Sequence, residues 1–209
     1  MDRGKFITIE GIEGVGKSTH MDSLVGSIEA KGHKVISARE PGGTPTAERI
    51  RDVVLGHNDE PISDIAELLL MFASRSLLVE NVIRPALSAG SWVVCDRFVD
   101  ASRAYQGGGR GIPMQQVNEL AKWVLGDLRP DLTILLDAPV EIGLSRASSR
   151  GNPDRLDVER AEFYTRVRET YLALSEAEPD RWIIVDASGE LDDVAASIDA
   201  VAAMILSDN

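Results

Sequence analysis

The chain has 209 residues, of which 44% are hydrophobic and 27% charged, a formal net charge of −12 and one cysteine, Cys95. This length fits one domain with a substantial core. The negative charge argues against a general binder of nucleic-acid polymers or membrane surfaces, because such proteins present basic patches. A lone cysteine excludes an internal disulfide, and no apolar run approaches the ~20 residues of a membrane span. The N-terminus enters a strand-like segment almost at once, which leaves no room for a signal peptide, so we expect a cytoplasmic protein.

In chain order, the first predicted element is a short β-rich run, FITIE (6–10), followed by a glycine-rich loop. Apolar residues from Met21 to Ile28 then recur with helical spacing, and Gly32 ends that helix. A second strand is predicted at 34–38. This order of strand, glycine loop and helix is the context in which a phosphate-binding loop is expected.

A short helix at 46–55 is followed by a long helical stretch from about 65 to 89. Ser63 or Asp64 is placed to cap the long helix, and Pro85 should bend its last turn. The long helix is apolar enough to serve either the core or a partner subunit. Its apolar content alone does not decide between the two.

The third strand is predicted at 92–96, and QGGGRG (106–111) after it is expected to form a loop. Pro113 should open a helix that ends near Leu125. A fourth strand at 132–138 and a helix at 140–149 follow. The alternation of apolar strands with helices indicates a parallel sheet covered on both faces.

The polar, turn-rich segment SSRGNPDRLD (148–157) is typical of a flap, and we take about 146–158 as a lid. A helix through Tyr171, a strand at 182–187 and a closing helix complete the chain. We therefore predict a single domain over 1–209, with a three-layer α/β/α sandwich around a five-stranded parallel sheet.

Residues Gly11 to Ser18 fit the pattern G-x-x-x-x-G-K-[ST] of a nucleoside-triphosphate loop. Its backbone N–H groups and the N-terminus of the next helix should gather phosphate oxygens. Lys17 should reach the β- and γ-phosphates, and Ser18 should ligate Mg²⁺. An acid within such a loop, Glu13, is unusual because it would oppose an anion if it faced the phosphates.

Other known classes of nucleotide-binding protein lack support in the sequence. No Asn-Lys-x-Asp motif is present to recognise guanine, and no His-Arg-Asp loop indicates a protein kinase. A small-molecule kinase is favoured. The alternatives are a kinase for another nucleoside monophosphate or a deoxynucleoside, and a nucleotide-binding module that transfers no phosphate.

Acidic and basic residues at the strand ends support a kinase. Asp96 ends the third strand, at the edge of an open sheet where ligands bind, and should hold Mg²⁺ or its water. Arg97 beside it is the best candidate to clamp an acceptor phosphate, and Arg39, at the end of the second strand, is placed to hold the same group.

Six ordered motifs extend this interpretation over nearly the whole chain. Together they resemble the bacterial thymidylate kinases, a family of nucleoside-monophosphate kinases that transfer phosphate from ATP to dTMP with Mg²⁺ and are usually homodimers. The motifs are GIEGVGKS (11–18), REPGGT (39–44), FASR (72–75), DRF (96–98), AYQGGGRG (104–111) and RPDLTILLD (129–137).

For ATP, the resemblance implies a binding loop and a lid that closes over it. Because no basic residue lies within the loop, the lid should supply the transition-state arginine, either Arg150 or Arg155, while Arg146 lies against adenine. Lys17 and Arg97 complete the expected catalytic set. The residues expected to bind ATP are Gly11, Ile12, Glu13, Gly14, Val15, Gly16, Lys17, Ser18, Thr19 and Arg146.

For dTMP, the resemblance places Glu13 on the acceptor side, near the sugar 3′-hydroxyl. Phe72 and Arg75 should stack on thymine and hydrogen-bond its O4, although many relatives have the Phe at the position of Met71. Tyr105 should lie under the sugar and exclude a 2′-hydroxyl. The residues expected to bind dTMP are Glu13, Arg39, Arg51, Phe72, Arg75, Arg97, Ser102, Tyr105 and Gln106.

Overall fold

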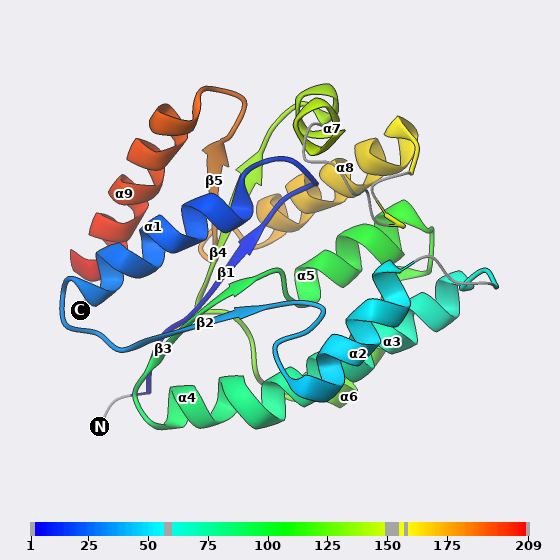
Figure 1. Ribbon diagram of the computed structural model, residues 1–209, viewed down its shortest axis with the longest axis horizontal. Helices are drawn as coiled ribbons and strands as arrows, with labels where there is room; N and C mark the ends of the chain where they lie inside the picture. Colours follow the sequence, from blue (N-terminus) through cyan, green and yellow to red (C-terminus); the bar gives the residue numbers. More distant parts are fainter. Residues whose placement is uncertain (1–2, 57–59, 149–154, 157–158, 208–209) are drawn as a thin grey trace.

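A five-stranded, all-parallel sheet forms the centre of the computed structural model, which describes residues 3–56, 60–148, 155–156 and 159–207. The strands lie in the order β2-β3-β1-β4-β5, with helices on both sides of the sheet (Figure 1). This confirms the predicted fold class. The strands are β1 (Phe6–Glu10), β2 (Val35–Arg39), β3 (Trp92–Asp96), β4 (Leu132–Asp137) and β5 (Trp182–Asp186).

The helices found in the described residues correspond to the predicted ones except in the middle of the chain, where the long helix is interrupted and the segment after β3 is helical. They are α1 (Lys17–Glu29), α2 (Pro45–Leu55), α3 (Asp64–Leu78), the π-helix η1 (Val79–Ile83), α4 (Arg84–Ser88), α5 (Val99–Ser102), the π-helix η2 (Arg103–Gly109), α6 (Met114–Leu125), α7 (Val140–Ser148), α8 (Ala161–Ala177) and α9 (Leu191–Ser207).

Alternate residues of the central strands pack into different cores, as the period of a pleated strand requires. Ile7 and Ile9 of β1 belong to the core that includes α1, α8 and α9. Phe6, by contrast, packs with residues of α3, α4 and α6. All five residues of β1 are buried, because the strand lies in the middle of the sheet and is covered on both faces.

The predicted long helix is interrupted. Ser63 caps its start, its hydroxyl oxygen accepting a hydrogen bond from the Ala66 N–H at 3.3 Å. The α-helix then widens into η1, where the N–H of Arg84 bonds to the carbonyl of Val79. Pro85 follows directly and has no N–H with which to continue the α-helical ladder.

The segment 106–111, predicted as a loop, is largely helical, because η2 extends through Gly109. Its glycines allow close packing against α8. A Cβ on Gly109 would lie 2.4 Å from Cε2 of Phe163, and one on Gly108 would lie 2.0 Å from Oγ1 of Thr170. The loop prediction was wrong because the glycines serve a helix contact here rather than a turn.

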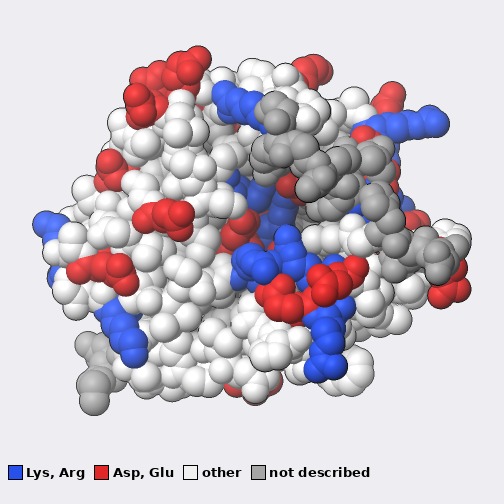
Figure 2. Space-filling model, viewed as in Figure 1, with Lys and Arg blue, Asp and Glu red and all other residues white. Residues whose placement is uncertain are grey.

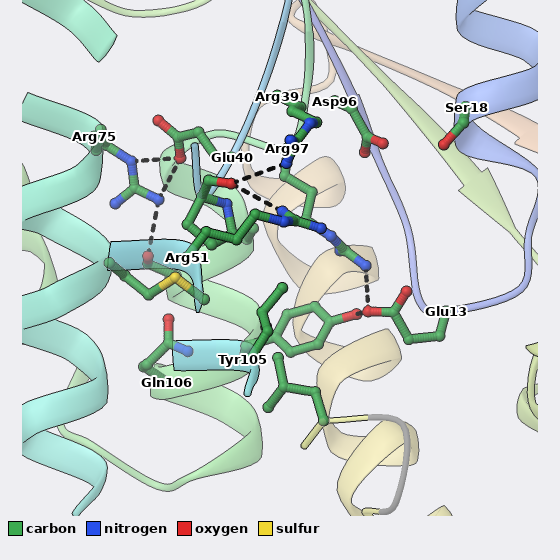
Figure 3. Close-up of a pocket in the computed structure, with 16 residues that line it drawn as sticks. Glu13, Ser18, Arg39, Glu40, Arg51, Arg75, Asp96, Arg97, Tyr105 and Gln106 are labelled. Atoms are coloured by element: carbon green, nitrogen blue, oxygen red, sulfur yellow. Dashed lines mark hydrogen bonds and ion pairs between the residues drawn. The ribbon is translucent and has the colours of Figure 1, made fainter. Parts of the chain in front are cut away.

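Because the strands are parallel, their C-terminal ends share one edge of the sheet. The glycine loop after β1, Arg39 at the end of β2 and Asp96 at the end of β3 therefore lie near one another (Figure 3). No helix in the described residues is both long and apolar enough to cross a bilayer.

Two glycine substitutions test the packing of η2. Gly109→Ala should lower the free energy of unfolding by about 1–3 kcal/mol, because its methyl group would overlap the Phe163 ring. Gly26→Ala, in α1 with nothing near its Cβ position, should raise it by about 0.5–1 kcal/mol. Urea unfolding of both variants measures this, and equal effects of the same sign would contradict the packing account.

Candidate functional site

The glycine loop leads from β1 into the N-terminus of α1. Gly14 and Gly16 have φ values of 76° and 87°, which L side chains rarely adopt. A Cβ on Gly14 would also lie 1.9 Å from the carbonyl oxygen of Gly143. The loop therefore requires glycine for both its shape and its contact with α7.

Lys17, the first residue of α1, is turned back into the loop. Its ammonium group donates to the carbonyls of Ile12 at 2.8 Å and Gly11 at 3.2 Å. Burial, together with the nearby charge of Arg97, lowers the pKa of Lys17 from its ordinary value. The same ammonium group lies 3.9 Å from Oε2 of Glu13, so its charge partner in the loop is a carboxylate.

Arg97 connects the glycine loop to a neighbouring cavity. Its guanidinium donates to the carbonyl of Gly11 at 2.9 Å and to Oε1 of Glu13 at 2.6 Å. The same guanidinium lies over the ring of Tyr105, 4.8 Å from the centroid. Among the described residues other than glycine, Arg97 is the one with a positive φ, 67°.

Glu13 is turned toward this cavity. Besides Arg97, the Tyr105 hydroxyl donates to its Oε1 at 3.2 Å, and the Lys17 ammonium is 3.9 Å from Oε2. The acid in the loop is therefore contacted by a phenol and two cations. Figure 3 shows the contacts of Glu13 with Arg97 and Tyr105. This arrangement explains how the loop tolerates a carboxylate next to a site for anions.

The cavity opens at the C-terminal edge of the sheet, between the glycine loop and helices α2, α3 and η2. Figure 2 shows a hollow in this face with both basic and acidic side chains in it. The lining residues are Glu13, Ser18, Arg39, Glu40, Pro41, Arg51, Leu55, Met71, Arg75, Asp96, Arg97, Ala101, Ser102, Tyr105, Gln106 and Leu156. Every residue expected to bind dTMP is among them except Phe72.

One end of the cavity is formed by buried polar groups. Arg75 donates to Glu40 Oε2 at 2.8 Å and to the Ser102 hydroxyl at 3.0 Å, and its guanidinium lies 4.5 Å from the Phe72 ring centroid. Its Nη1 and the Oε1 of Gln106 are buried and have no hydrogen-bond partner in the described part of the chain. A ligand with one acceptor and one donor would satisfy both.

Phe72 belongs to the core behind this end of the cavity. It is 2% exposed and packs with the α4 and α6 side of the sheet. Met71, one residue earlier, lines the cavity instead. The expectation that Phe72 stacks on a ligand is therefore at odds with its position. Consecutive side chains of an α-helix point about 100° apart, so Phe72 and Met71 face different surroundings.

Two more arginines lie toward the cavity mouth. Arg39 pairs with Glu48 at 2.9 Å, and Arg51 donates to the carbonyl of Pro41 at 2.8 Å. Both side chains extend from different elements, β2 and α2, toward Arg97 (Figure 3). The acceptor side of the cavity is thus rich in guanidinium groups.

The predicted metal ligands, Ser18 and Asp96, both line the cavity and an adjoining pocket. Oδ1 of Asp96 is buried without a hydrogen-bond partner among the described residues. A hydroxyl and an unsatisfied carboxylate oxygen at the phosphate loop are suitable ligands for Mg²⁺, which binds few protein groups and retains waters. The described residues contain no cluster of three or more acidic, His or Cys side chains for a tighter metal site.

The lid arginines are only partly described, and Arg150 lies outside the described residues. Arg146 of α7 donates to the carbonyls of Ala187, Ser188 and Gly189, the turn after β5. Arg155 donates to the carbonyl of Val54 and to Glu67. In this conformation Arg155 is held by groups of α2 and α3, and its expected role over the γ-phosphate stays a prediction.

Glu10, the last residue of β1, was not among the predicted site residues. Its buried carboxyl accepts hydrogen bonds from the Phe98 N–H at 2.8 Å and from the Tyr171 hydroxyl at 2.7 Å. It thereby fixes the backbone directly after Arg97. The available signal was a carboxylate that ends an otherwise apolar strand directly before the glycine loop.

Comparison with known proteins gives one consistent result. The thymidylate kinase family model matches residues 9–198. The thymidylate kinase of Pseudomonas savastanoi pv. phaseolicola is 52% identical over 203 residues, 97% of each chain, and that of Methylococcus capsulatus is 53% identical over 191 residues, 91% of each chain. The crystal structure of thymidylate kinase from Ehrlichia chaffeensis has a TM-score of 0.79 and 29% identity, covering 98% of this chain and 99% of that one.

The pH dependence of stability tests the environment of Glu10. Burial, reinforced by the charge of Asp100, raises the pKa of Glu10 to about 8. The folded protein therefore retains a proton that the unfolded chain loses above about pH 4.5, so this carboxyl's contribution to stability declines as the pH rises toward 8 and is lost above it. Glu10→Gln, which cannot ionise, should remove that decline, of the order of a few kcal/mol.

Urea unfolding of both proteins from pH 5 to 9 measures this effect. The unfolding free energy of the parent protein should fall relative to that of Glu10→Gln across this range. A difference between the two proteins that does not change with pH would show that Glu10 ionises normally.

Proposed function

The chain belongs to the thymidylate kinase family, and on that premise we propose that it transfers the γ-phosphoryl group of ATP to dTMP, giving dTDP and ADP with the aid of Mg²⁺. The observation that carries the assignment is the unpaired donor and acceptor at the buried end of the cavity, Arg75 Nη1 and Gln106 Oε1. They complement the O4 acceptor and the N3–H donor of thymine.

The base is held at this end, between α3 and η2. Cytosine would present an amino group to Arg75 and an unprotonated ring nitrogen to the Gln106 oxygen. A donor would then face a donor at Arg75, and an acceptor would face an acceptor at Gln106. Leaving two buried polar groups without hydrogen bonds lowers the binding free energy enough to reject cytosine strongly. Ser102 supports the site by accepting a hydrogen bond from Arg75, and Met71 supplies apolar contact in place of Phe72.

The sugar lies over Tyr105, in the middle of the cavity. The ring of Tyr105 is 3% exposed and is fixed by packing against Phe163 and Tyr171. A ribose 2′-hydroxyl directed at this ring would lose its water partners without gaining new ones. Glu13, hydrogen-bonded to the same tyrosine, is available for the 3′-hydroxyl.

The acceptor phosphate is held by Arg97, with Arg39 and Arg51 beside it. Guanidinium groups bind phosphate oxygens in pairs, which fixes the direction of the attacking oxygen as well as neutralising its charge. An oxygen of the dTMP phosphate forms the new bond to the γ-phosphorus, and the bond from that phosphorus to the β–γ bridging oxygen breaks. No general base is needed, because the attacking oxygen is already anionic.

The donor is held by the glycine loop, residues Gly11 to Thr19. Lys17 would leave the carbonyls of Gly11 and Ile12 for the β- and γ-phosphates, and the lid arginines Arg146, Arg150 and Arg155 would cover the nucleotide. For Arg155 this requires release from Glu67. Held by Ser18 and Asp96, Mg²⁺ would neutralise charge on the transferring group.

We further propose a cytoplasmic homodimer that acts on free nucleotides and not on nucleic-acid polymers. Helices α2, α3 and α6 pack together and expose large apolar side chains, namely Val53, Ile65, Leu69 and Trp123. Such side chains are suited to a subunit interface. The buried free thiol of Cys95 is consistent with a reducing compartment, and the net charge of −12 disfavours a polymer of phosphates.

A panel of acceptors tests the proposal. With ATP and Mg²⁺, ADP formation should be fastest with dTMP, slower with dUMP, and far slower with UMP and dCMP. Lys17→Ala should reduce turnover of dTMP by at least about a hundredfold while remaining folded, because the developing charge loses its main cation. Equal turnover of UMP would contradict the acceptor assignment, and ATP binding without ADP formation on any acceptor would indicate a module that transfers no phosphate.

A further inference from the structure

Glu67 of α3 is a fully buried carboxylate that lies just outside the cavity lining. Its Oε1 accepts a hydrogen bond from Nε2 of Gln106 at 2.8 Å. Arg110 donates to both of its oxygens, at 3.3 and 3.1 Å, and Arg155 donates to Oε2. One carboxylate thus joins α3 to η2 and to the described end of the lid.

The carboxylate of Glu67 is ionised despite its burial. Burial acts to raise the pKa of Glu67, but hydrogen bonds from Arg110, Gln106 and Arg155 outweigh it and hold the pKa below the ordinary value. At neutral pH both oxygens are therefore acceptors and neither can donate.

This fixes the orientation of the Gln106 amide. An amide facing an acceptor-only group must present its nitrogen, so Nε2 faces Glu67 and Oε1 takes the opposite side of the amide plane. Gln106 is 1% exposed and lines the cavity, and its Oε1 has no partner among the described residues. Figure 3 shows the amide oxygen on the side toward Arg75.

We propose that Glu67 is a positioning residue for base selection: by holding the Gln106 amide with its oxygen toward the cavity, it makes the site accept a pyrimidine with a ring N–H. The inference rests on the proposed function, because it concerns how the same cavity recognises thymine. Without Glu67, both orientations of the amide would be open, and the nitrogen would offer a donor to the unprotonated N3 of cytosine.

An isosteric amide at position 67 should reverse the orientation of the Gln106 amide. Oε2 of Glu67 accepts the shorter Arg110 hydrogen bond, at 3.1 Å, whether or not Arg155 is also bound there, whereas Oε1 accepts from Gln106 and from Arg110 at 3.3 Å. Glu67→Gln should therefore place its oxygen at the Oε2 position and its NH₂ group where Oε1 was. That NH₂ group would face Nε2 of Gln106, donor against donor. Gln106 would then turn its oxygen toward position 67 and its nitrogen into the cavity.

The test compares dTMP with 5-methyl-dCMP, two acceptors that share the 5-methyl group and the sugar and differ only at N3 and the 4-position. For Glu67→Gln, the ratio of kcat/KM for dTMP over 5-methyl-dCMP should fall by about ten- to a hundredfold, mainly through the KM for dTMP. The matched control is Glu159→Gln. Glu159 also pairs with Arg110 but does not contact Gln106, so this variant should keep the ratio of the parent enzyme.

A second background separates positioning from a general loss of packing. Gln106→Leu removes the amide oxygen from the cavity. Adding Glu67→Gln to this variant should therefore not change its ratio of kcat/KM for dTMP over 5-methyl-dCMP. If Glu67→Gln does not fold, Glu67→Asp replaces it. The shorter side chain withdraws from Gln106, so the kcat/KM ratio for dTMP over 5-methyl-dCMP should again fall.

An unchanged ratio in folded Glu67→Gln, or an equal change in the Gln106→Leu background, would overturn the inference while leaving the proposed function intact. Failure of the parent enzyme to use dTMP would instead overturn the proposed function, and the inference with it.

Discussion

The contact between Arg97 and the glycine loop is the interaction on which the site depends. One guanidinium holds the carbonyl of Gly11 and the carboxylate of Glu13, and thus fixes the distance between the triphosphate loop and the acceptor cavity. The backbone of Arg97 has a positive φ of 67°, which costs roughly 1–2 kcal/mol for a residue with a Cβ. The structure maintains this conformation with hydrogen bonds on both sides, from the Arg97 N–H to Ile9 and from the Phe98 N–H to Glu10.

Buried charges around this contact are paired with charges of opposite sign. Lys17 and Arg97 flank Glu13, while Arg75 is paired with Glu40 and Arg110 with Glu67. Each of these cations therefore lies near an anion, while Arg75 Nη1, Asp96 Oδ1 and Gln106 Oε1 have no hydrogen-bond partner among the described residues. The same pairing explains why an acid within a phosphate loop does not prevent anion binding. Its charge is directed to Arg97 and Tyr105 and away from the glycines.

Much of this arrangement could be predicted from the sequence, because strong local signals specify it. Apolar strands and the G-x-x-x-x-G-K-S loop determine the parallel sheet, and parallel strands bring Arg39, Asp96 and the loop to one edge. Tertiary contacts decided the rest. The glycines of η2 appear as a loop in sequence but pack against α8, and Phe72 turns into the core while Met71 meets the cavity. Glu10 and Glu67 could not be assigned, because a buried carboxylate acquires its role only from partners distant in sequence.

A crystal structure of the protein with dTMP and a non-hydrolysable ATP analogue tests the central claim most directly, namely that Arg97 joins the two nucleotides. The account predicts the dTMP phosphate within hydrogen-bond distance of the Arg97 guanidinium, facing the γ-phosphate, with the thymine edge on Arg75 and Gln106. A dTMP phosphate bound elsewhere, with Arg97 still engaged by Gly11 and Glu13 and not by the phosphate, would contradict it.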